Sequence, residues 1–125
     1  EEIKKNKNIK YLFFLVPTFS FSTYLDHFFP KVYNRQLGGG HTHLYTEESI
    51  KYFCKEYDFS IVGEWWFGSD LMDLLRDGLV SLSQNTCSET FIDKYNNILG
   101  SKLDELQLVF DKSKLSSEVH MLLRV

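Results

Sequence analysis

Apolar residues follow one another without interruption in the first predicted element. Residues 9–16 form a β-branched and aromatic run that Pro17 ends. Such a run is typical of a strand that is buried on both faces, as in a parallel sheet. The pattern therefore predicts a strand that needs other strands beside it and helices on both of its faces.

The hydrophobic pattern becomes irregular over residues 18–45. Ser, Thr and aromatic residues mix there, Pro30 interrupts the segment, and three glycines occupy residues 38–40. Glycine permits backbone conformations that other residues avoid. Since a loop of this length inside a compact domain is usually functional or mobile, we expect residues 18–45 to form such a loop.

Helical periodicity begins after Thr46, whose side chain provides an N-cap. Glu47 and Glu48 follow in the first turn, where the helix dipole favours negative charge. Apolar residues then recur every three or four positions up to Tyr57. These signals predict an amphipathic helix.

Strand and helix patterns alternate in the next part of the chain. Residues 59–67 are predicted to form a strand, in which Gly63 indicates a bulge or the close approach of another backbone. Leucines at helical spacing predict a second helix that starts near Asp70. A third helix is expected over residues 88–110, although Gly100 weakens its middle by about 1 kcal/mol relative to Ala.

The last predicted strand is residues 117–125, where apolar and polar side chains alternate. The order of elements is therefore strand, long loop, helix, strand, two helices, strand. This order indicates the α/β class with an incomplete sheet. The strands at residues 59–67 and 117–125 form the best available pair, and an antiparallel arrangement suits them as well as a parallel one.

Composition and charge restrict the classes of function. The chain has 125 residues, with 14 Lys plus Arg and 17 Asp plus Glu, so its formal net charge is −3. That balance argues against a nucleic-acid partner. Its longest apolar run is far shorter than the roughly 20 residues of a membrane span. We therefore expect no membrane partner. Because Cys54 and Cys87 are too few for a disulfide framework, we also expect free thiols and a cytoplasmic location.

Residues 39–62 contain the most recognisable motif. Two histidines and a tyrosine precede Thr-Glu-Glu-Ser at the start of a helix, and Asp58-Phe59 leads into a strand. The stretch resembles the C-terminal half of a class I S-adenosylmethionine-dependent methyltransferase, in which a Gly-Phe pair, at the position of Asp58-Phe59, usually leads into the sixth strand. Residues 12–17 then resemble the fifth strand of that family, and residues 118–125 resemble its antiparallel seventh strand.

The resemblance implies an α/β fold in which residues 1–125 are the C-terminal part of a Rossmann-like methyltransferase sheet, strands five to seven. Residues 18–45 would form a substrate-side loop, and residues 70–112 a helical insertion before the last strand. The family's glycine-rich turn and acidic residue, which hold the cofactor, have no counterpart here. S-adenosylmethionine would therefore be bound mainly by a missing N-terminal half of the same polypeptide, as the start at Glu1 without Met also suggests. The resemblance leaves open whether the protein forms a homo-oligomer.

The resemblance places the active site at the carboxyl ends of the strands, beside the substrate-side loop. His41 and His43 are the predicted catalytic residues, since His is the natural base near neutral pH. In an extended segment both would point the same way as Tyr45, the first predicted substrate-binding residue. The alternative is that both histidines satisfy backbone groups at the start of the helix. No Cys or carboxylate pair stands at a ligand spacing, so no metal is expected.

Trp65, Trp66 and Asp70 are the other predicted substrate-binding residues. Indole rings at the end of a strand stack on sugar or nucleotide rings, and a carboxylate accepts a hydrogen bond from a hydroxyl. In the alternative interpretation, Trp65 and Trp66 face opposite sides of the sheet, each packs under a helix, and Asp70 is the N-cap of a helix.

The resemblance implies methyl transfer to an oxygen, nitrogen or carbon atom of a small molecule, with a sugar or a polysaccharide precursor as the preferred substrate. The alternative is a non-catalytic protein-interaction module. In that case the third predicted helix and the aromatic residues of the loop would bury against a partner. The 16 % aromatic content indicates that part of the surface is normally covered, by a partner in this case or by the missing half in the other.

Overall fold

A three-stranded sheet and six helices make up the part of the chain that the structure, a computed structural model, describes: residues 2–32, 34–36, 38 and 40–125. Glu1 and Gly39, which entered the sequence argument, lie outside the described residues. The elements are α1 (Glu2–Lys5), β1 (Tyr11–Pro17), α2 (Phe21–Phe28), α3 (Glu47–Glu56), β2 (Ser60–Phe67), α4 (Asp70–Gln84), α5 (Glu89–Gly100), α6 (Leu103–Lys112) and β3 (Glu118–Arg124). The three predicted strands and the α/β class are therefore confirmed.

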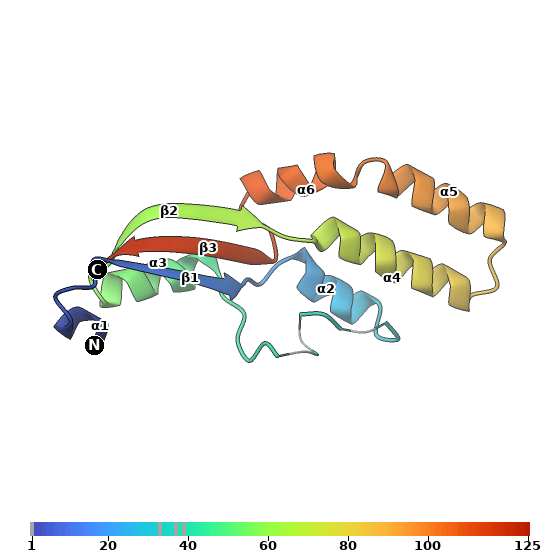
Figure 1. Ribbon diagram of the computed structural model, residues 1–125. Helices are drawn as coiled ribbons and strands as arrows, with labels where there is room; N and C mark the ends of the chain where they lie inside the picture. Colours follow the sequence, from blue (N-terminus) through green and yellow to red (C-terminus); the bar gives the residue numbers. More distant parts are fainter. Residues whose placement is uncertain (1, 33, 37, 39) are drawn as a thin grey trace.

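β3 is the central strand of the sheet and runs antiparallel to both of its neighbours, in the order β1-β3-β2. β1 and β2 therefore run parallel to each other on opposite sides of β3 (Figure 1). The register of β2 shifts between Ile61 and Gly63, which confirms the bulge that Gly63 predicts. Such a bulge increases the local twist of the strand.

α3 covers one face of the sheet and forms the hydrophobic core with it (Figure 1). Period-two alternation brings every second residue of each strand to this face. The buried core side chains are those of Ile50, Cys54, Trp66, Val119, Met121 and Leu123. Burial of an aliphatic side chain of this size stabilises the fold by roughly 1.5–3 kcal/mol, so this layer holds α3 on the sheet. Burial also raises the pKa of the Cys54 thiol.

The prediction that the first strand is buried on both faces is wrong for the described residues. Leu12, Phe14 and Val16 pack toward α3, while Phe13 and Leu15 are 60 % and 58 % exposed. The run is apolar enough for two covered faces, but only one layer of helix lies on the sheet. β1 is also an edge strand, because β3 is its one strand partner among the described residues.

Residues 21–28 of the expected long loop form α2 instead. Phe21, Leu25 and Phe28 stand at helical spacing, which the Ser and Thr residues between them hide in the sequence. Leu25 is 1 % exposed, so its burial stabilises the helix that local propensity alone would not.

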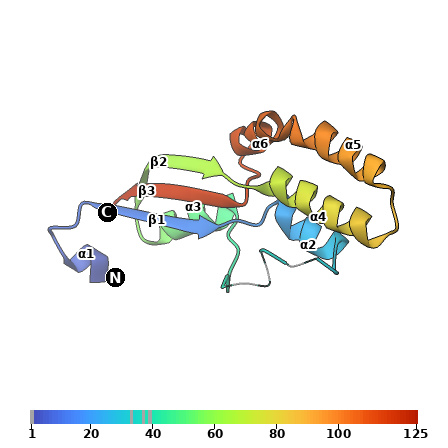
Figure 2. The same cartoon turned by 45° about the vertical axis from the view of Figure 1, so that its right-hand side comes forward.

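α4, α5 and α6 form a helical arm that projects beyond the sheet (Figure 1, Figure 2). The prediction of one helix over residues 88–110 is wrong, because α5 ends at Gly100 and α6 begins at Leu103. Glycine has the lowest helix propensity of all residues except Pro, and residues 101–102, directly after Gly100, form a turn between the two helices. Among the described residues, no helix combines the length and the apolar composition that a membrane span requires.

Gly78 on α4 sets how closely α5 approaches. The Tyr95 hydroxyl donates a hydrogen bond to the Leu74 carbonyl at 2.9 Å, which brings the Tyr95 ring against the Gly78 backbone. A Cβ at Gly78 would lie only 2.9 Å from Cε1 of that ring and closer still to its outer atoms. The helix pair therefore needs glycine at this position.

We predict that Gly78→Ala lowers the free energy of unfolding by about 1–3 kcal/mol, because the added methyl group overpacks the Tyr95 contact. Gly100→Ala is the matched control: its Cβ would meet nothing closer than 3.7 Å, so it should raise stability by up to about 1 kcal/mol through helix propensity. Urea denaturation followed by circular dichroism measures both. Equal effects of the two substitutions would contradict the proposed close approach.

Candidate functional site

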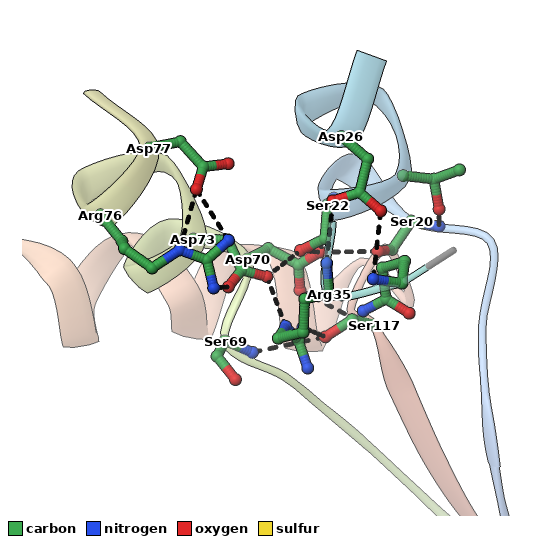
Figure 3. Close-up of polar contacts among 12 residues, drawn as sticks. Ser20, Ser22, Asp26, Arg35, Ser69, Asp70, Asp73, Arg76, Asp77 and Ser117 are labelled. Carbon is green, nitrogen blue, oxygen red and sulfur yellow. Dashed lines mark hydrogen bonds and ion pairs between the residues drawn. The ribbon is translucent and has the colours of Figure 1, made fainter. Parts of the chain in front are cut away.

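The carboxyl ends of β1 and β2 meet the start of β3 beside α2 and α4, and polar side chains gather there (Figure 3). Ligands of open α/β sheets bind at the carboxyl ends of parallel strands, so this is the place to look for a site. The set, called the polar cluster below, comprises Ser20, Ser22, Asp26, Arg35, Ser69, Asp70, Asp73, Arg76, Asp77 and Ser117.

Asp70 lies at the centre of the polar cluster and is 0 % exposed (Figure 3). Its Oδ1 accepts hydrogen bonds from the Ser20 hydroxyl at 2.7 Å and from Ser22, through Oγ at 2.8 Å and N–H at 3.1 Å. Its Oδ2 accepts from Ser117 N–H at 2.9 Å and Gln107 Nε2 at 3.4 Å. The carboxylate predicted to bind substrate therefore faces the interior, where donors surround both of its oxygens.

Arg35 ties the segment after α2 to the polar cluster. Its Nε donates to Asp73 Oδ2 at 2.7 Å, and its Nη2 donates to the Ser117 hydroxyl at 3.0 Å. Arg76 contacts the other oxygen of Asp73 at 3.4 Å and pairs with Asp77 at 2.7 Å. The buried carboxylates of Asp73 and Asp77 therefore each have a guanidinium partner.

The charge of the polar cluster is predominantly negative, with more carboxylates than guanidiniums. Burial raises the pKa of the Asp77 carboxyl, the Arg76 partner opposes this shift, and the neighbouring Asp73 and Asp26 carboxylates reinforce it. Because the folded pKa lies above the unfolded value, the contribution of Asp77 to stability is present below the unfolded pKa and is lost as the pH rises through the folded pKa.

Gln36 is the least satisfied residue beside the polar cluster. Its backbone N–H donates to Asp26 at 3.1 Å, next to the N–H of Arg35 at 3.3 Å. Its side chain is 0 % exposed, yet neither Oε1 nor Nε2 has a hydrogen-bond partner in the described structure. Leaving a buried amide group unpaired costs roughly 1–3 kcal/mol, so this position holds unused hydrogen-bonding capacity.

The segment that carries His41 and His43 reaches the carboxyl end of β1. Tyr45 N–H donates to the Pro17 carbonyl at 3.0 Å, and Phe19 N–H donates to the Tyr45 carbonyl at 2.8 Å. This parallel bridge fixes Tyr45 just past the end of the strand. Both histidines are exposed, and His43 Nδ1 lies 2.9 Å from the hydroxyl of the intervening threonine.

The start of α3 is capped without the histidines. Thr46 Oγ1 accepts from Ser49 N–H at 3.2 Å, and Thr46 N–H donates to Ser49 Oγ at 2.9 Å. This reciprocal pair confirms the predicted N-cap. No described hydrogen bond joins His41 or His43 to these backbone groups, so the imidazoles face solvent beside the end of β1.

An ion-pair network joins α3 to the sheet. Lys114 contacts Glu47 at 2.9 Å and also pairs with Glu64, while Lys51 contacts Glu47 at 2.8 Å. The two lysines lower the pKa of Glu47, and the two carboxylates raise the pKa of Lys114. Because the Tyr45 bridge precedes α3 directly, the network helps to fix the segment that carries the histidines.

Trp65 and Trp66 lie on opposite faces of the sheet, as the alternative interpretation predicts, but its prediction that each packs under a helix is wrong for Trp65. Trp66 is 7 % exposed in the core, whereas Trp65 is 63 % exposed on the open face. The Trp65 ring lies 4.9 Å from Phe67 and 5.5 Å from His120 between centroids. The two indoles therefore do not form one stacking platform.

Only part of the predicted site comes together. Thr18 links Tyr45 to the polar cluster, because it forms the bridge to Tyr45 and its N–H donates to the Ser117 carbonyl at 2.9 Å. In the described structure no hydrogen bond, ion pair or ring contact joins His41 or His43 to Trp65, Trp66 or Asp70. Ser69 is the N-cap of α4 and Asp70 is its first residue, so the alternative prediction that Asp70 is the N-cap is wrong.

Sequence reasoning missed most of the polar cluster. One signal was present: Asp70, Asp73 and Asp77 stand at positions i, i+3 and i+7, so they share one face of α4. All three are buried, which an acidic stripe on a solvated face would not be. Arg35 and the serines belong to segments with no periodic pattern, so no local signal identified them.

Metal-binding side chains do not cluster among the described residues. No three His, Cys, Asp or Glu side chains among them converge as a metal ion requires. The carboxylates that would suit ribose hydroxyls already accept bonds within the polar cluster. Comparison of the chain with protein-family models, with curated proteins and with solved structures gives no match.

We predict that Asp70→Asn lowers the free energy of unfolding by about 2–4 kcal/mol, because an amide group turns donors toward donors in a buried site. Asp93→Asn on the exposed face of α5 is the control and should change stability by less than about 0.5 kcal/mol. Thermal and urea unfolding measure the difference.

Ser20→Ala supplies a milder test in case Asp70→Asn does not fold. It removes one of the donors to Asp70 and should cost about 1 kcal/mol. Wild-type stability of both Asp70→Asn and Ser20→Ala would show that the carboxylate does not hold the elements together.

Proposed function

We propose that the chain is the C-terminal part of an S-adenosylmethionine-dependent methyltransferase that acts on a small molecule, with a sugar or a polysaccharide precursor as the preferred substrate. The observation that carries the proposal is the direction of the strands. β1 and β2, which the sequence likens to the fifth and sixth strands of that family, run parallel, and β3, likened to the seventh, runs antiparallel to both.

The open surfaces of the sheet also support the proposal. β1 is an edge strand with an apolar sequence, and three of its side chains, Tyr11, Phe13 and Leu15, are more than half exposed. An edge of this kind in a stable protein is normally paired or covered. Further strands and helices of the same polypeptide, outside residues 1–125, would pair with this edge and cover this face.

The chain's own residues would act on the substrate side. Their position past the carboxyl end of β1 suits His41 and His43 for contact with the methyl acceptor. One imidazole would accept the proton of the acceptor oxygen, nitrogen or carbon atom, and the cofactor, when bound, would supply the methyl group from its sulfonium. Tyr45 would line the acceptor side, and Arg35 would hold the preceding segment through Asp73.

The cofactor would be held mainly by the part of the enzyme that precedes Glu1, since the family's glycine-rich turn and acidic residue have no counterpart in residues 1–125. A cytoplasmic location is part of the same proposal, and the free thiols of Cys54 and Cys87 support it.

We predict that residues 1–125 alone show no micromolar affinity for S-adenosylmethionine. A longer chain that includes the residues encoded upstream of Glu1 should bind it, and those residues should contain a strand followed by a glycine-rich turn. Isothermal titration calorimetry on both chains measures the affinities. Micromolar binding by residues 1–125, or no binding by the longer chain, would overturn the proposal.

Variants of the longer chain separate binding from chemistry. The double change His41→Gln and His43→Gln should lower the rate of methyl transfer by about 100-fold or more while the cofactor affinity stays constant. His27→Gln, on α2, is the control that should leave the rate unchanged.

The open face of the sheet favours a second candidate, a protein-interaction module. Phe13, Trp65 and Phe67 surround His120 there, with ring centroids 4.7–5.5 Å from it. Small-angle scattering discriminates the two functions. A dimer of residues 1–125 that persists when the upstream residues are present favours the module, whereas a longer chain that is monomeric, with the open face covered, favours the enzyme.

A further inference from the structure

A groove crosses the helical arm where α2, α4 and α5 meet. Its larger part, of about 590 Å³, lies between α4 and α5. A smaller part, of about 260 Å³, lies beside the end of α4 and residues 28–32. Phe29 and Ser81 line both parts, so the two adjoin and are called the arm groove below.

The larger part of the arm groove is lined mainly by apolar side chains. Leu74 and Leu82 come from α4, and Phe91 and Ile98 come from α5. Phe91 is 56 % exposed and Ile98 is 74 % exposed. Large apolar side chains that border a groove and face water are typical of a binding surface.

The floor of this part offers no free hydrogen-bonding group from Tyr95. Its hydroxyl already donates to the Leu74 carbonyl at 2.9 Å, and burial with the nearby Asp77 carboxylate raises its pKa. Asp77 itself is paired with Arg76 at 2.7 Å, on the side of α4 that faces the polar cluster. The floor therefore suits a hydrocarbon chain and not a charged group.

Two cations border the groove. Lys94 lines the larger part and Lys31 the smaller part, and no acidic residue is among the described residues that line either. Neither lysine forms an ion pair with another described residue. In a chain with a net charge of −3, a groove whose charged groups are both positive favours an anion.

Polar side chains accompany Lys31 in the smaller part. Ser81, Gln84 and Asn85 line the smaller part, next to Lys31. They supply hydroxyl and amide donors, which suit phosphate oxygens. The arm groove thus has a larger apolar part, bordered by Lys94, and a smaller part that carries Lys31 and the hydrogen-bonding side chains.

We propose that the arm groove binds a single-chain anionic amphiphile of the alkyl phosphate class. The hydrocarbon chain lies along α4 and α5 on Leu74, Leu82 and Ile98, and the phosphate lies at the lysines. The volume falls in the range of small-molecule sites, roughly 300–1,000 Å³. The proposal is independent of the methyltransferase function, because it uses no residue of the polar cluster.

Decyl phosphate below its micelle concentration is the probe, with residues 1–125 labelled at the isoleucine methyl groups. Saturable shifts of the Ile98 methyl signals are expected, without shifts of Ile61, which is exposed on β2. Decanol should bind about tenfold more weakly, and inorganic phosphate alone should leave Ile98 unchanged. Equal shifts of Ile61 and Ile98, or shifts of Ile98 by inorganic phosphate alone, would overturn the proposal.

Calorimetry with variants tests the two parts of the arm groove. Lys94→Ala should weaken the binding of decyl phosphate by about 3- to 10-fold, and Lys55→Ala, exposed on α3, is the control that should leave it unchanged. Ile98→Asp should abolish binding. Because Ile98 is 74 % exposed, the circular dichroism spectrum of this variant should match that of the wild type.

Equal affinities of the Lys94→Ala and Lys55→Ala variants would overturn the assignment of the phosphate to Lys94. If Ile98→Asp does not fold, the lysine pair alone decides. Binding that is seen only with phosphatidylglycerol vesicles, and not with monomeric decyl phosphate, would show that the surface contacts a membrane and would overturn the proposed single-chain site.

Discussion

The buried carboxylate of Asp70 connects elements that no backbone ladder joins. Its oxygens accept hydrogen bonds from residues before and within α2, from the start of β3 and from α6, and the residue itself begins α4. Moving an ionised carboxylate out of water costs several kcal/mol, so the charge is tolerated only because donors from these elements surround it. Assembly of the donors and burial of the charge therefore depend on each other.

That dependence places the candidate site. Once Asp70 holds α2 and the start of β3, Arg35 reaches both Asp73 and Ser117, and Thr18 contacts the same stretch of β3. The Tyr45 bridge follows from the position of Thr18. The segment with the two histidines is thus anchored at the end of β1 by backbone bonds, while its imidazoles stay exposed, as a substrate-side segment requires.

The three strands and α3 could be predicted because their signals are local. Thr46 caps α3 within its own sequence neighbourhood, and the apolar run before Pro17 has no other secondary structure that suits it. α2 was not predicted, because the burial of Leu25 and not a local signal stabilises it. The break after Gly100 was not predicted, because the apolar periodicity stays in phase on its two sides.

The polar cluster could not be predicted for a different reason. The bonds from Ser22 and Ser117 to Asp70 span 48 and 47 residues of sequence. A serine or an aspartate in an irregular segment looks the same whether it meets water or a buried partner. The acidic stripe of α4 was the exception, since a helix that buries three carboxylates on one face requires cationic and hydroxyl partners somewhere else in the chain.

α4 links the two proposals through the rigidity of a single helix. Asp70, Asp73 and Asp77 face the polar cluster, whereas Leu74 and Leu82 line the arm groove. Because α4 is continuous over 15 residues, the direction of the arm is fixed by the same carboxylates that close the carboxyl ends of β1 and β2. A ligand in the arm groove would therefore be held at a defined orientation to the segment that carries His41 and His43, without a hinge between them in α4.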